Sequence, residues 1–125
     1  MGFGPHIERH EMTPGELNIT TETLDEMLIV RPTGEVDLGC ATLLQENLAT
    51  ALAGTTNKLI IDLVGVPYMD SSGVATLVEA MQVARRNNIN LLLCNMQDRV
   101  RSIFEIARLD TVFVIVDDID AARGV

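Results

Sequence analysis

Apolar and polar residues follow two different periods along this chain, and the change of period separates predicted strands from predicted helices. A strand signal begins with the alternating residues Leu17, Ile19 and Thr21, a second runs from Met27 to Pro32, and a short polar link joins the two segments. This pattern predicts two neighbouring antiparallel strands. Later come nearly continuous apolar runs, which are typical of strands buried on both faces. These runs cover residues 58–63, 89–94 and 111–116.

Between these strands the apolar residues recur every three or four positions, which predicts amphipathic helices. The predicted helices cover residues 41–53, 72–86, about 100–107 and 117–123. Gly54 is placed to end the first helix, and Asn87 and Asn88 are placed to close the second. Strands that alternate with helices predict an α/β fold. We expect one domain with a mixed, mainly parallel β-sheet of about five strands and about four helices.

The first 16 residues contain Pro and Gly and show no periodicity, so we interpret them as a flexible N-terminal extension to a domain of residues 17–125. His6 and His10 are four positions apart and would share one face of a helix. Nearby Pro and Gly residues disfavour that helix, and we therefore expect no metal site.

The amino-acid composition limits the kinds of molecule that this chain is expected to bind. The net charge of −9 disfavours binding to nucleic acid or to an anionic membrane, because both reward Lys and Arg. We find no signal peptide and no apolar run long enough to span a bilayer. Cys40 and Cys94 lie far apart, without the spacing of a metal knuckle. We expect a cytoplasmic protein with buried, reduced thiols, in which Cys40 serves as a small apolar filler.

The segment Met69–Val74 lies where a buried strand ends and an amphipathic helix begins, and it contains Ser71 and Ser72. The first turn of a helix has free backbone N–H groups and a dipole that favours negative charge, so it can accommodate a phosphate. A serine there can act as a phosphorylation switch. The simpler alternative is that Asp70, Ser71 or Ser72 only caps the helix.

Two loops are expected at the carboxyl ends of neighbouring strands, where functional groups of open α/β sheets gather. They are the predicted turn Gly34–Asp37 and the segment Pro67–Gly73. We therefore expect Glu35 and Asp37 to lie close to Asp70, Ser71 and Ser72. An acidic rim around a hydroxyl suits recognition by a kinase, and it equally suits helix capping and loop solvation.

The residues disfavour an enzyme. A serine hydrolase needs a base beside its nucleophile, and both histidines lie in the extension. No nucleophile elbow, P-loop or dinucleotide fingerprint is present, so we expect no cofactor. Asp37 and Asp70 could act as an acid–base pair. Nothing beside them in the sequence indicates a substrate pocket.

These motifs together resemble the STAS domains, and within them the small anti-sigma-factor antagonists of bacterial partner-switching systems. The segment Gly34–Asp37 is similar to the family's G-E-[LV]-D turn. Residues 60–63 followed by 68–73 resemble its strand and phosphorylation loop, and residues 93–95 and 100–109 resemble its later strand and third helix. The resemblance runs from about Leu17 to the C-terminus.

The resemblance implies that Ser71 is phosphorylated by an anti-sigma factor that is also a Ser/Thr kinase. The unphosphorylated antagonist would bind this partner, the phosphorylated form would release it, and a PP2C-type phosphatase would reset the switch. Ser72 would be a neighbour and a helix cap. The partner-binding residues would be Glu35, Asp37, Asp70, Ser71, Ser72 and Gly73. The alternative implied by the same family is a structural STAS subunit of a lipid-transport ABC system or of a stress-signalling assembly.

Overall fold

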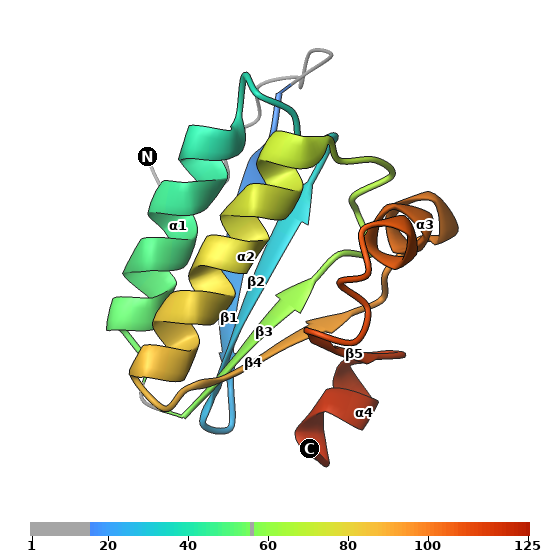
Figure 1. Ribbon diagram of the computed structural model, residues 1–125. Coiled ribbons are helices and arrows are strands. Elements are labelled where there is room, and N and C mark those ends of the chain that lie inside the picture. Colours follow the sequence, from blue (N-terminus) through green and yellow to red (C-terminus); the bar gives the residue numbers. More distant parts are fainter. Residues whose placement is uncertain (1–15, 56) are drawn as a thin grey trace.

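A single five-stranded sheet forms the centre of the molecule (Figure 1). The computed structural model describes residues 16–55 and 57–125, so the predicted extension and its two histidines lie outside the described residues. The strands lie in the order β1-β2-β3-β4-β5; β1 is antiparallel to β2, and the remaining pairs are parallel. The predicted mixed, mainly parallel sheet is confirmed. The strands are β1 (Asn18–Leu24), β2 (Met27–Thr33), β3 (Lys58–Asp62), β4 (Asn90–Cys94) and β5 (Val114–Val116).

Helices connect the parallel strands and cover the sheet unequally. Two long helices lie side by side across one face, and a third follows at the β4 and β5 side (Figure 1). The helices are α1 (Ala41–Ala53), α2 (Ser71–Arg86), α3 (Asp98–Ile106) and the short α4 (Ile119–Arg123). In the described part of the chain no helix combines the length and the apolarity needed to cross a bilayer.

Two apolar clusters hold these layers together, one on each face of the sheet. The larger cluster joins α1, α2 and α3 to the sheet through residues such as Leu44, Leu77 and Phe104. The smaller one lies on the opposite face, where Ala122 of α4 packs with Ile29 and other strand residues. All five residues of β3 are buried, which confirms the prediction that this strand is covered on both faces.

Several predicted boundaries differ from those in the structure: β1 begins at Asn18 rather than Leu17, α3 at Asp98 rather than about residue 100, and α4 at Ile119 rather than residue 117. The last strand begins at Val114 rather than at residue 111, because the N–H groups of Val112 and Phe113 both donate to the carbonyl of Leu109 and close a turn. Helix α2 begins at Ser71, which agrees with the predicted start at about Ser72 to within one residue. The segment 34–37 is not a tight turn: Val36 pairs with another loop, and the turn follows at residues 38–40.

Candidate partner-binding site

Two loops at the carboxyl ends of β2 and β3 meet side by side, as the sequence predicted. Val36 donates its N–H to the carbonyl of Tyr68 at 3.0 Å, and Asp70 donates to the carbonyl of Val36 at 2.9 Å. These bonds form a parallel bridge between Val36 and Met69, both fully buried. The bridge brings the segment that contains Glu35 and Asp37 next to the start of α2.

Asp70 is the N-cap of α2, and both of its carboxylate oxygens accept hydrogen bonds. Oδ1 accepts from the Ser72 N–H at 2.9 Å, from the Gly73 N–H at 3.3 Å and from the Ser72 hydroxyl. Oδ2 accepts from the Leu38 N–H at 3.2 Å, across the two loops. The Ser72 hydroxyl, followed by these backbone donors, lowers the pKa of Asp70, since each bond favours the charged carboxylate.

Ser71 and Ser72 are neighbours in sequence but differ in their surroundings. Ser71 is the first residue of α2 and is exposed, so its hydroxyl lies open to a partner at a helix N-terminus. Ser72 is half-buried, and its hydroxyl donates to Asp70. The expectation that Ser72 is the cap was therefore wrong. Asp70 caps the helix, because its carboxylate reaches the N–H groups two and three residues ahead.

Gly73 is buried where α2 approaches the bridged loop most closely. A β-carbon at this position would lie 2.7 Å from Cγ1 of Val36 and 3.1 Å from Cβ of Met69. Carbon atoms in ordinary contact are about 3.5–4.0 Å apart, so a side chain here would push the two loops apart. Because Gly73 has no side chain, it permits the close packing that positions Ser71.

The turn after Asp37 is closed by short-range hydrogen bonds. Asp37 Oδ1 accepts from the Gly39 N–H at 3.0 Å, and its carbonyl accepts from the Cys40 N–H at 3.1 Å. The Cys40 thiol is buried and donates to the carbonyl of Glu35 at 3.3 Å. Burial raises the pKa of the Cys40 thiol, which keeps it protonated. Cys40 therefore fills space beneath the loop, as the sequence predicted, while Glu35 is exposed above it.

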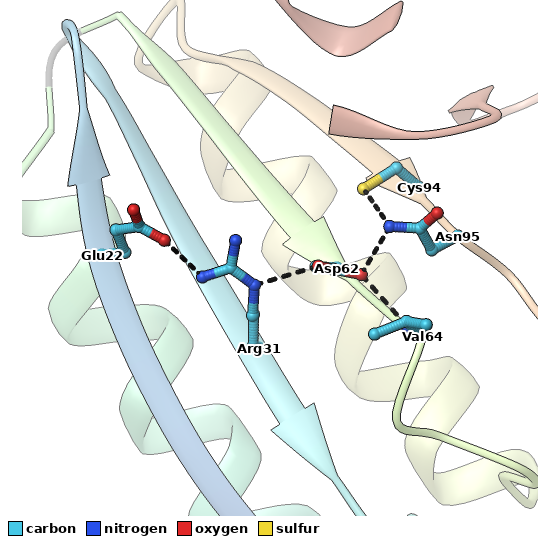
Figure 2. Close-up of polar contacts among 6 residues, drawn as sticks. All are labelled: Glu22, Arg31, Asp62, Val64, Cys94 and Asn95. Atoms are coloured by element: carbon cyan, nitrogen blue, oxygen red, sulfur yellow. Dashed lines mark hydrogen bonds and ion pairs between the residues drawn. The ribbon is translucent and has the colours of Figure 1, made fainter. Parts of the chain in front are cut away.

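A polar network that was not predicted from the sequence crosses the face of the sheet opposite α1 and α2 (Figure 2). Asp62, at the end of β3, is buried and accepts from Arg31 Nε at 3.0 Å, from Asn95 Nδ2 at 3.0 Å and from the Val64 N–H at 3.1 Å. Arg31 also donates to Glu22 at 2.6 Å. The signal was available: Arg31 is the one charged residue of β2, and Asp62 ends an apolar run in β3.

This network fixes the beginning of the loop that leads to Ser71. Asp62 holds the N–H of Val64, and the carbonyl of Val64 accepts from Gln97 Nε2 at 2.7 Å. Farther along the same loop, the guanidinium of Arg99 lies 5.3 Å from the centre of the Tyr68 ring, which is a cation–π contact. The loop is therefore attached both to β3 and to the start of α3. Neither contact was predicted.

The geometry gives no support to the Asp37–Asp70 acid–base pair considered from the sequence. Asp37 accepts the Gly39 N–H of its own turn, and both Asp70 oxygens accept backbone N–H groups, one of them the Leu38 N–H of the other loop. The hydrogen bonds to the charged form of Asp70 lower its pKa, which makes Asp70 a weaker base. The arrangement suits an exposed hydroxyl set in a rigid acidic surface, and such a surface suits recognition of another protein.

Comparison with known proteins agrees with this fold. The STAS domain model matches residues 18–122. The chain belongs to the STAS domain family. Among curated relatives, the anti-sigma-B factor antagonist of Staphylococcus aureus is 32% identical over 93 residues, which are 74% of this chain and 86% of the relative. The resemblance stated from the sequence is thereby confirmed.

Solved structures share the fold of this STAS domain at lower identity. An anti-sigma factor antagonist from Mycobacterium paratuberculosis superposes with a TM-score of 0.79 at 21% identity, covering 90% of this chain and 95% of that one. The unphosphorylated form of SpoIIAA gives 0.66 at 22% identity, covering 86% and 100%. The phosphorylated form of SpoIIAA, a Bacillus cell fate determinant, gives 0.65 at 21% identity, covering 85% and 97%.

Proposed function

We propose that this STAS domain is an anti-sigma-factor antagonist whose partner binding is switched by phosphorylation of Ser71. The observation that carries the proposal is that Ser71 is exposed at the first turn of α2, beside Asp70, whose carboxylate caps the helix. The curated relatives are named anti-sigma-B factor antagonists, and SpoIIAA has been solved in phosphorylated and unphosphorylated forms.

The proposed partner is a cytoplasmic anti-sigma factor that is also a Ser/Thr kinase. It would bind the surface formed by Glu35, Asp37, Asp70, Ser72 and Gly73 around Ser71, and a PP2C-type phosphatase would restore the unmodified state. Exposed or half-buried carboxylates on this surface favour a partner face that contains Lys or Arg. Nucleic acid and membrane surfaces are disfavoured by the net charge of −9.

Phosphate would act on this surface by local charge and bulk. It adds about −1.5 to −2 charges, and a helix N-terminus can accommodate them, so the fold need not change. A change in affinity of 100-fold requires only about 2.7 kcal/mol of differential binding free energy. Placing a dianion beside Asp70, inside the partner's contact surface, would impose this difference by repulsion and by desolvation.

The first experiment compares Ser71→Ala and Ser71→Glu proteins as baits in a lysate of the native organism. We expect the Ala form to retain a kinase-type ATPase and the Glu form to lose it. Ser102→Glu is the matched control, because it adds the same charge at an exposed serine on α3. The control should retain the kinase like the wild-type chain.

Two other outcomes would contradict the proposal. If both Ser71 variants retain the kinase equally, phosphorylation does not control the contact. If both retain membrane-transport subunits or a large signalling assembly equally, the domain is a structural STAS subunit. Ser71 would then be only the first residue of α2, without a regulatory role.

A further inference from the structure

Leu38 is a large apolar side chain that remains 78% exposed at the tip of the turn between β2 and α1. Among the described residues only Ile106, on α3, is a more exposed large apolar residue, at 83%. The leucines of α1 that face the sheet, such as Leu44 and Leu48, are almost completely buried. The exposure of Leu38 therefore reflects its position on the turn, which directs it away from the core.

The backbone of Leu38 is held firmly although its side chain is free. Its N–H donates to Oδ2 of Asp70 at 3.2 Å, so the helix cap of α2 also fixes this turn. On either side, the turn is closed by the bonds from Gly39 and Cys40 to Asp37. Because this backbone is already fixed, binding through the Leu38 side chain would not require the loop to become ordered, which favours an interface anchor.

Carboxylates surround this apolar tip. Asp37 precedes Leu38 directly, Asp70 contacts its N–H, and Glu35 lies exposed on the same loop. Interfaces often centre on an apolar residue that enters a pocket and is enclosed by polar contacts. The chemistry that fits this surface is a shallow apolar pocket on a protein, bordered by Lys or Arg side chains that face the carboxylates.

We propose that Leu38 is the apolar anchor of the interface with the anti-sigma kinase. The inference rests on the proposed function, because it adds a contact to the same surface. It also gives Asp70 a second role, since the carboxylate beside the phosphorylated serine holds the backbone of the anchor. Phosphate on Ser71 would then disturb both the carboxylates around Leu38 and the contact made by Leu38 itself.

Single exposed leucines are common on protein surfaces, so the test needs a matched control. Ile106→Ala removes an equally exposed aliphatic side chain from a different helix. Leu38→Ala removes the proposed anchor but keeps the N–H that bonds to Asp70. Leu38→Met keeps an apolar side chain of similar volume and should restore binding.

The experiment uses a purified Ser/Thr-kinase anti-sigma factor from the native organism, with Kd measured by calorimetry and phosphorylation of Ser71 measured at varied antagonist concentration. We expect Leu38→Ala to raise Kd and KM about tenfold or more, which corresponds to about 1.4 kcal/mol. The kcat at saturation should stay within about twofold, since Ser71 and its surroundings are kept. Leu38→Met and Ile106→Ala should each remain within about threefold of the wild-type Kd.

The outcomes separate this inference from the proposed function. If the kinase binds the wild-type chain and Leu38→Ala with equal Kd, Leu38 is not an anchor, while the Ser71 switch stands. A fall in kcat without a rise in KM would also overturn the inference, because it would place Leu38 in the transfer step. If the kinase neither binds nor phosphorylates the wild-type chain, the proposed function falls, and the inference falls with it.

Discussion

At the scale of single residues, Asp70 decides the geometry of the site. One carboxylate caps α2, engages the Ser72 hydroxyl and holds the turn that contains Leu38. As a result, Ser72 is engaged and Ser71 is left exposed at the helix start. The difference between the two serines therefore comes from the neighbouring aspartate rather than from the serines themselves.

Replacing Asp70 by Ala should destabilise the fold by about 1 kcal/mol at neutral pH, because the helix loses its N-cap. The folded-state pKa of Asp70 is lowered, so its charged form stabilises the fold above the unfolded pKa of about 3.9. This contribution is lost as pH falls through the folded-state pKa. The gap between wild-type and variant Tm should therefore narrow below about pH 4.

The control for this prediction is Asp98→Ala, which removes an acidic residue from the first turn of α3 without removing a side-chain cap. Its Tm should fall less at neutral pH, since a charge near a helix start contributes only about 0.3–1 kcal/mol. A gap between wild type and Asp70→Ala that stays constant from pH 7 to pH 3 would refute the role of the charged cap.

At the scale of elements, the loop before α2 is positioned by strands that are distant in sequence. Asp62 joins β2, β3 and the residue after β4 through Arg31 and Asn95, and it binds the N–H of Val64 (Figure 2). Three donors on one buried carboxylate satisfy the charge that burial would otherwise penalise. The network thus fixes the point at which the loop between β3 and α2 leaves the sheet.

Asp62→Ala should lower the free energy of unfolding by about 3 kcal/mol, because it leaves Arg31 and Asn95 without their acceptor. Arg31 is about one-third exposed, which moderates the loss. Arg123→Ala is the comparison, since it breaks an exposed ion pair with Asp25 and should cost at most about 1 kcal/mol. Urea denaturation gives the free energy of unfolding of both variants. Equal losses would show that the buried network stabilises the fold no more than the exposed ion pair does.

At the scale of the whole molecule, the switch must act on a protein that is already strongly acidic. The net charge of −9 changes little in proportion when one group is added, so long-range repulsion cannot distinguish the two states. The effect must come from the position of the new charge on the partner surface. The fold supports this, because the loops around Ser71 are attached to β3, to α3 and to each other.

Ser71→Glu should abolish partner binding without weakening the fold. A glutamate in the first turn of α2 interacts favourably with the helix dipole, so Tm should stay constant or rise slightly. Hydrogen exchange of the α2 amides should match that of the wild-type chain. If Tm fell by several degrees, release would follow from local unfolding instead of local charge.

Much of this architecture could be predicted because it depends on short stretches of sequence. Period-two and period-3.6 patterns located the elements to within a few residues, and Gly54 and Asn87 marked helix ends correctly. The meeting of the two acidic loops also followed from strand order. The last strand was predicted too long, because the turn that removes residues 111–113 depends on hydrogen bonds to Leu109 and on packing of Phe113 against Phe104.

The sequence by itself determined the fold class, the family and the position of the serine motif, because periodicity, turn residues and motif spacing are local properties. Only the tertiary structure decided that Asp70 is the cap, that Ser71 rather than Ser72 is exposed, and that Leu38 is fixed beside them. It also decided the Arg31–Asp62 network. The Leu38–Asp70 contact spans 32 positions and the Arg31–Asp62 contact spans 31. Such contacts exist only once strand register and helix packing have brought the segments together.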